Sequence, residues 1–497
     1  MSKKLLHPSR SFYATIWGVI SGVAFSTFFW HLPLSFGWLA LALVLCFVVL
    51  FLPTPFALVL AFCGGLIIAN CRTTPLYTSK NFAEQLYGQE IILIGQIFEA
   101  PTTDSGRSIV RLQHLQLVDN SSNPVDKVQE NVENNVEKTV QNIAGTAYIQ
   151  LDQTYSELER SDILTVTGSV NQGFGTFLLT MYRAKPLDVQ RTTTGDPFAR
   201  LKNWFANLVR DYIPSPESGL GLGYLMGMKS DLSDSLSETL QLVGMTHVIV
   251  ASGAHLGILV NGARRIFGRI SRFAGLFCSI FLIFTFVSIV GFTPSMTRAS
   301  LVSILSLSFG YLGRRFTPFR LLSLTAAITL LIDPTNLINL GWQLSFASFS
   351  GLLILSPRFT RLFYGGKSLP WLASMLITSL STTIACAPIL IYNFGSISLL
   401  AFVANLIILP TLPYAMLLVV LTGVTSFLPI LATLIAKLTT LLLGLHIAIV
   451  TFLSTKSMFI LELQSGSLYI FLFYLPLITY LIFPQIKKTL HPSLLRP

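Results

Sequence analysis

Long apolar runs occupy most of the chain, and short polar segments join them. Each run is close to the length of about 20 residues that an α-helix needs to cross a bilayer. The pattern therefore predicts a polytopic α-helical membrane protein with about 12 transmembrane helices. The expected spans lie near residues 12–30, 34–52, 56–70, 244–263, 273–291, 295–313, 320–334, 338–356, 370–392, 397–422, 428–453 and 467–484.

The segment between the third and fourth runs has a different periodicity. Five short stretches rich in Ile, Val, Thr and Leu are separated by Gly, Pro, Asn and Asp, which is typical of β-strands. We therefore predict an inserted all-β, OB-like domain over residues 71–195. Residues 119–142 are polar and rich in Asn and Glu, which predicts a disordered and dispensable insertion.

Residues 196–214 have an amphipathic pattern. Aromatic and aliphatic side chains fall on one helical face, whereas Arg200, Lys202 and Arg210 fall elsewhere. This pattern predicts a helix that lies in the membrane interface. The chain thus divides into an N-terminal membrane segment, the β domain, the interfacial helix and a second membrane domain, with the membrane parts at residues 1–70 and 215–497.

Composition excludes a soluble enzyme, because 52% of the 497 residues are hydrophobic and 11% are charged, whereas soluble domains have about 25% charged residues. Over residues 240–497, 16 residues are basic and two are acidic. Three basic loops and the C-terminal tail fall on one side of the expected membrane, which places both termini in the cytoplasm and the β domain outside. The five cysteines show no paired spacing, so neither a disulfide framework nor a metal site is predicted.

Polar residues inside apolar spans are the candidate functional residues, because such residues usually face a bundle interior or a cavity. The first group is HVIVASGAHLG, with His247, Ser252, Gly253 and His255. Its small residues allow either close helix packing or a local unwinding of the helix. We favour a lined cavity, and a kinked helix packed on its neighbour is the alternative.

Further candidates come from later spans and complete a predicted polar path. Arg298 either contacts an anion or extends its charged end outward to the membrane surface. Asp333 is expected on the same side of the membrane as Arg298 and is a possible partner for it. Lys437 forms an ion pair, lines an aqueous path, or shows that the predicted boundary of its span is misplaced. The remaining candidates are Pro294, Ser295, Gln343 and Asn405.

Four motifs in order resemble those of the ComEC family, the membrane channel proteins that bring DNA across the bacterial cytoplasmic membrane during natural transformation. HVIVASGAHLG, PSMTRA, DPTNLINLGWQLSF and ANLIILP match the family's order and spacing over residues 217–425. The three-span start and the external OB-like domain agree with the family as well. The resemblance implies a channel for single-stranded DNA that works with membrane lipid, a cytoplasmic ATPase or helicase and an external DNA receptor.

We expect this chain to lack one part of many ComEC proteins. Those members continue into a metallo-β-lactamase-like domain thought to degrade the non-transported strand, and this chain has no His/Asp metal cluster after its last span. GGKS at residues 365–368 lacks the first glycine of a P-loop. We therefore expect a channel with no enzyme activity and no cofactor, served by a separate nuclease. Because the membrane potential opposes anion entry, a motor or proton coupling must supply the work.

Two other functions remain open at this stage. An intramembrane serine hydrolase would use Ser252 as its nucleophile, with His247 or His255 as the base. A solute transporter is favoured by the broken helices, but inverted repeats are not visible in the sequence.

Overall fold

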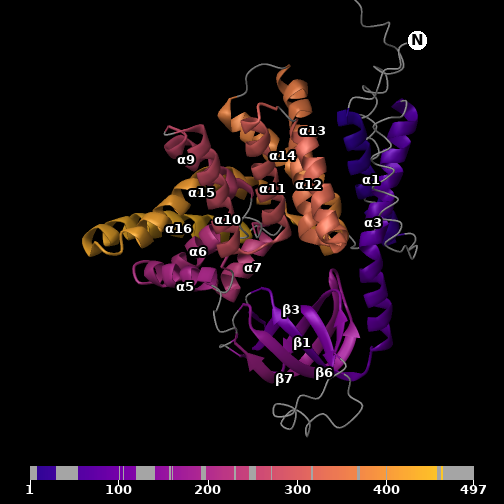
Figure 1. Ribbon diagram of the computed structural model, residues 1–497. Helices are drawn as coiled ribbons and strands as arrows, with labels where there is room; N and C mark the ends of the chain where they lie inside the picture. The colour runs from indigo at the N-terminus through magenta and orange to yellow at the C-terminus, as the bar shows by residue number, and fades with distance from the viewer. Residues whose placement is uncertain are drawn as a thin grey trace, which may run out of the picture.

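The computed structural model describes residues 8–28, 54–99, 101–104, 106–118, 140–155, 158, 160–191, 197–228, 231–245, 253–269, 271–314, 317–365, 370–398, 400–455 and 460–462. Most helices form one body, a β-barrel lies at one end of that body, and two N-terminal helices run along its side (Figure 1). The predicted spans 34–52 and 467–484, together with residues 119–139 of the insertion, lie outside the described residues.

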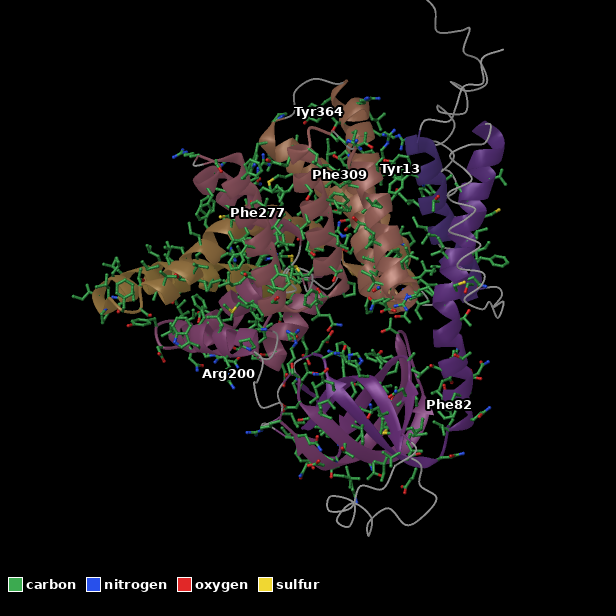
Figure 2. The ribbon with its side chains drawn as sticks, in the orientation of Figure 1. Tyr13, Phe82, Arg200, Phe277, Phe309 and Tyr364 are labelled. Atoms are coloured by element: carbon green, nitrogen blue, oxygen red, sulfur yellow. The ribbon has the colours of Figure 1, made fainter. Side chains whose placement is uncertain are left out.

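The N-terminal helices α1 (Pro8–Phe28) and α3 (Thr54–Gln85) pack closely against each other. Glycines permit this approach, because a Cβ atom on Gly18 would lie 2.2 Å from the backbone oxygen of Phe62. The hydroxyls of Ser26 and Thr73 are hydrogen-bonded between the helices. Because α3 continues beyond residue 70 to Gln85, the boundary expected at residue 71 falls inside a helix, and Phe82 lies beside the barrel (Figure 2).

Every one of the five predicted strands is present in the β domain. They are β1 (Glu90–Ile97), β3 (Arg107–Val118), β5 (Thr146–Leu151), β6 (Ile163–Gln172) and β7 (Phe177–Gln190). The strand order is β1-β6-β7-β5-β3, and antiparallel pairing of β1 with β3 closes the barrel. The pairing of β5 with β7 is parallel. Two short strands, β2 (Thr102–Asp104) and β4 (Val140–Ile143), pair with β3, so the end of the predicted insertion forms a strand.

Every second side chain along a strand points into the barrel, and these side chains fill its interior. In β5, Ala147, Ile149 and Leu151 are fully buried, while the residues between them are only partly buried. Leu93, Leu112, Leu164 and Met181 from the other strands complete the same interior. The period of two that predicts the strands therefore also predicts the residues that fill the barrel.

Three shorter helices lie between the barrel and the larger helices: α5 (Pro197–Arg210), α6 (Glu217–Met226) and α7 (Asp234–Leu242). The amphipathic helix α5 buries Ala206 and Val209, whereas Trp204 is 58% exposed. Arg210 donates two hydrogen bonds to Asp231. Burial, and secondarily the nearby positive charge of Arg160, lowers the pKa of Lys202. Charged groups thus collect where the barrel meets α5.

The remaining helices follow in sequence and make up most of the body. Side chains cap the N-termini of two of them, α11 and α13: Thr293 accepts a hydrogen bond from the Met296 N–H, and Asn339 accepts one from the Trp342 N–H. The elements are α9 (Gly253–Phe267), α10 (Arg272–Val290), α11 (Pro294–Tyr311), α12 (Pro318–Ile332), the 3₁₀ helix η3 (Pro334–Ile338), α13 (Leu340–Tyr364), α14 (Trp371–Phe394), α15 (Leu400–Val424) and α16 (Pro429–Ser454).

Several of these helices suit a bilayer. Among the described helices, α10, α14, α15 and α16 are long and apolar enough to cross a membrane, and α1 and α12 contain shorter apolar stretches. Large apolar side chains are exposed on these helices, such as Phe277 on α10 and Ile430 on α16. The chain is therefore a membrane protein with an attached β domain.

Candidate functional site

Arg298 lies in the second turn of α11, with 7% of its surface exposed. Its Nε atom donates a hydrogen bond of 2.6 Å to the Ser345 hydroxyl on α13, and Ser345 donates in turn to Ser295, at 3.3 Å. The guanidinium carbon lies 5.0 Å from the ring centroid of Phe349 and 6.0 Å from that of Phe346. Hydroxyls and aromatic rings therefore hold the charge between two helices, and Arg298 does not extend outward to the surface.

The first turn of α9 also lies next to the Arg298 guanidinium. A Cβ atom on Gly253 would lie 3.2 Å from the Cβ of Ala299 and 3.6 Å from Arg298 Nη2. An added Cβ would press on Ala299 and touch the guanidinium, so Gly253 brings the α9 backbone close to Arg298. His255, two residues further along α9, is 2% exposed. Ser252 and His247 lie outside the described residues, so the structure brings together Gly253, Ser295 and Arg298 from the predicted path and adds Ser345.

Asp333 does not pair with Arg298, contrary to the interaction expected from the sequence. Its carboxylate accepts hydrogen bonds from the backbone N–H and the hydroxyl of Thr335, at 3.0 and 2.7 Å. The reason is local, because Asp333 caps η3 and uses its carboxylate for that purpose. Arg298 consequently has the Ser345 hydroxyl as its hydrogen-bond partner, and among the described residues no carboxylate forms an ion pair with it.

The other candidates lie on different elements. Pro294 is the first residue of α11, as predicted. Gln343 donates to the Leu337 carbonyl at 2.8 Å and so ties α13 to η3. Asn405 is on α15, and its buried Oδ1 has no hydrogen-bond partner in the described part of the chain. Lys437 is exposed on α16. Among the described residues, no side-chain hydrogen bond or ion pair joins these four residues to Arg298.

A second buried polar group lies between α6, α15 and α16. His446 Nε2 is 2.8 Å from the Thr411 hydroxyl, and the ring of Tyr224 lies 5.9 Å from that of His446. Thr411 also donates to the Ile408 carbonyl in its own helix, between Pro410 and Pro413. The Thr411 hydroxyl and His446 Nε2 share one hydrogen bond. This contact joins α15 to α16.

Ser345 is the main residue that sequence reasoning missed. A serine in a span is unremarkable by itself, since its hydroxyl can bond to a backbone carbonyl of its own helix. The available signal is spacing, because Ser345 and Phe349 are four residues apart and therefore share a helix face. That face meets α11, but only the tertiary structure shows which residue of α11 it contacts.

Among the described residues, no group of three or more His, Cys, Asp or Glu side chains could hold a metal ion. The chemistry available in the membrane part is instead that of a buried cation with hydroxyl and aromatic neighbours. Together with the apolar helices and the barrel, this defines a helical membrane protein with an attached β domain and a buried cationic site.

The chain belongs to the Competence protein family, whose model matches residues 224–488. The match confirms the resemblance to ComEC proteins. The chain is also similar to ComE operon protein 3 of Bacillus subtilis (strain 168), with 26% identity over 212 residues. That similarity covers 42% of this chain and 26% of the relative, so this chain spans about a quarter of the relative's length. No solved structure matches the chain.

Proposed function

We propose that this chain forms a channel through which single-stranded DNA crosses the bacterial cytoplasmic membrane during natural transformation. Membership of the Competence protein family supports a role in DNA uptake. The observation that carries the channel itself is the environment of Arg298, which is buried in a membrane domain with hydroxyl partners. Among the described residues no carboxylate forms an ion pair with Arg298. A buried charge without a counter-charge is costly, and a passing phosphate would provide a negative charge.

The proposed path borders Arg298 and uses polar groups that bind an anion weakly. Serine hydroxyls and a guanidinium can exchange partners as successive phosphates pass, whereas a fixed carboxylate would compete with DNA at every step. Phe349, which is partly buried beside the guanidinium, adds a ring face on which a base can stack. Ser345 joins the residues proposed from the sequence, namely His247, Ser252, Gly253, His255, Pro294, Ser295, Arg298, Asp333, Gln343, Asn405 and Lys437.

The proposed topology has three spans, an external barrel and nine further spans, with both termini in the cytoplasm. The distribution of Lys and Arg in the loops supports this orientation. The parallel pairing of β5 with β7 supports an OB-like barrel. The structure suggests one change to the proposed domains, because α3 carries the first membrane segment beyond residue 70 to Gln85.

Other proteins must complete the process. Each phosphate that enters against an inside-negative potential costs about 2.3 kcal/mol per 100 mV, so we propose a cytoplasmic ATPase or helicase as the motor. An external receptor would deliver the DNA, and a separate nuclease would degrade the strand that is not transported. This chain would then act as a conduit and not as an enzyme.

Uptake of labelled DNA by cells that carry Arg298→Ala or Arg298→Lys tests the channel. We expect alanine to reduce uptake at least tenfold and lysine to retain part of it, because lysine keeps the charge but loses the fork of donors. Arg265→Ala, which removes an exposed arginine in the last turn of α9, is the matched control. Normal uptake by the Arg298→Ala variant at normal membrane abundance would refute the phosphate contact.

A further inference from the structure

Three aromatic rings gather on the outer surface of the barrel. Tyr148 lies on β5, Phe174 in the turn between β6 and β7, and Phe177 at the start of β7. Their ring centroids are 5.1 Å (Tyr148 to Phe174), 5.6 Å (Tyr148 to Phe177) and 5.4 Å (Phe174 to Phe177) apart, and each pair meets edge to face. Phe174 is 49% exposed. We refer to these three residues as the aromatic triad.

The backbone fixes the position of the aromatic triad. Tyr148 lies between the buried residues Ala147 and Ile149, so its ring points away from the barrel interior. The N–H of Phe177 donates to the carbonyl of Phe174 at 3.0 Å, and Gly175 between them has a φ angle of +59°. This tight turn holds the two phenylalanines next to each other, so the triad is preformed.

The barrel topology shows which face carries the triad. In chain order the five main strands are β1, β3, β5, β6 and β7, so Tyr148 lies on the third strand and Phe174 in the loop between the fourth and fifth. In OB-like barrels, the face of the second and third strands and the loop between the fourth and fifth strands bind oligonucleotides or oligosaccharides. Arg111, the direct strand partner of Tyr148, lies on that face and pairs with Glu99.

Charge alone would argue against nucleic-acid binding by this domain, since residues 71–195 contain 14 acidic and 10 basic residues. Stacking of bases on aromatic rings does not depend on net charge, because every base has an apolar face. An edge-to-face cluster that leaves Phe174 half exposed offers such a surface. Aromatic contacts can therefore give the barrel an affinity for bases that its charge does not provide.

We propose that the aromatic triad of Tyr148, Phe174 and Phe177 is a base-stacking site for single-stranded DNA on the barrel. This inference rests on the proposed function, because it assigns the DNA a contact outside the membrane path. The site recognises bases and not phosphates. It consequently favours single strands over duplexes, whose bases are already stacked on one another.

The test measures binding by the full-length protein in lipid nanodiscs. The probe is a fluorescent oligothymidylate of about 16 nucleotides, and an abasic deoxyribose-phosphate chain of the same length and charge is the competitor. We expect Phe174→Ala to weaken oligothymidylate binding about fivefold or more, the order of one lost base stack. Phe174→Trp should retain binding, and its indole fluorescence should be quenched by the bases. The abasic chain should compete poorly.

Tyr182→Ala is the matched control, because Tyr182 lies on β7 and is 50% exposed, yet makes no ring contact with another described aromatic residue. Its binding should change less than twofold. Unchanged binding by a folded Phe174→Ala variant would overturn the inference, as would equal competition by the abasic chain. Triad-dependent binding of a cell-wall polysaccharide in place of oligothymidylate would also overturn it.

The two proposals fail separately. Normal binding by Phe174→Ala together with lost uptake by Arg298→Ala would remove the stacking site and leave the channel. Lost binding by Phe174→Ala together with normal uptake by Arg298→Ala would remove the phosphate contact in the channel and leave the stacking site.

Discussion

Arg72 on α3 binds the end of α12 at Ile332. Its Nη2 donates to the Ile332 carbonyl and its Nε to the Leu331 carbonyl, both at 2.7 Å. The last carbonyls of a helix lack partners within the helix, and a cation at this end also interacts favourably with the helix dipole. At the other end of α12, Arg320 lies over the ring of Tyr13 from α1, at 4.9 Å. The N-terminal helices are thus fastened to both ends of α12.

Replacing Arg72 should loosen this attachment. We expect Arg72→Gln to lower the free energy of unfolding by about 1 kcal/mol, a modest value because the contact is exposed. Thermal unfolding of the purified protein in detergent should show a small decrease in the melting temperature. The melting temperature of Arg72→Lys should lie between those of the wild type and Arg72→Gln, since a lysine can supply one of the two hydrogen bonds. An unchanged melting temperature for Arg72→Gln would show that helix packing alone holds α3.

Glycine substitutions test the packing of α1 on α3. In Gly18→Ala the new Cβ would lie 2.2 Å from the Phe62 carbonyl oxygen, and backbone cannot move aside cheaply. We expect a loss of about 1–3 kcal/mol of stability, as for other overpacked contacts. Gly310→Ala, where nothing lies within 4 Å, is the control. Equal melting temperatures for the two variants would contradict the close approach of the helices.

The first turn of α9 offers a graded test beside Arg298. Gly253→Ala requires Ala299 to yield by a few tenths of an ångström, so we expect it to reduce DNA uptake only slightly. Gly253→Val adds two further carbons towards the guanidinium and should reduce uptake severalfold. Gly257→Ala, with open space around the new Cβ on the same helix, should behave as the wild type. Uptake should be normalised to membrane abundance, and equal uptake by all three variants would exclude Gly253 from the path.

Ser345→Ala removes the hydroxyl that accepts from Arg298. Because a buried hydrogen bond to a charged group contributes about 1.5–3 kcal/mol, we expect a measurable loss of thermal stability and a severalfold loss of uptake. Ser348→Ala is the control, since its hydroxyl bonds to the Ser345 carbonyl within α13. Wild-type behaviour of both variants would show that Ser345 does not hold the guanidinium.

The insertion in the barrel should be removable. Val118 pairs directly with Val140, so the two ends of residues 119–139 lie across one strand pair. A two-residue Asn-Gly turn can join such strands. We expect transformation by this deletion variant to stay within about twofold of the wild type, because the closed barrel is retained. Complete loss of transformation with normal protein abundance would identify the insertion as a docking element.

The sequence predicts those features that depend on local periodicity. The five barrel strands follow from alternation of apolar residues, and Pro294 marks the start of α11 because its fixed φ angle suits a first helical turn. The extension of α3 to Gln85 was not predicted, since the polar residues after Asn70 lack an apolar pattern. The predicted pairing of Arg298 with Asp333 is wrong for a different reason. Asp333 is used by its own local cap, and Ser345 is recognisable as a partner only once α11 and α13 are packed together.

The length of α3 sets the distance of the barrel from the bilayer. A helix of 32 residues is about 48 Å long, whereas the hydrocarbon core is about 30 Å thick. With its apolar part in the membrane as proposed, α3 carries its last turns well into the aqueous phase. The last turns of α3 consequently fix the distance between the barrel and the bilayer, and a tilt of α3 would move the barrel sideways over the membrane. Under the proposed function, a force that DNA exerts on the barrel would be transmitted along α3 and through the Arg72 hydrogen bonds to α12.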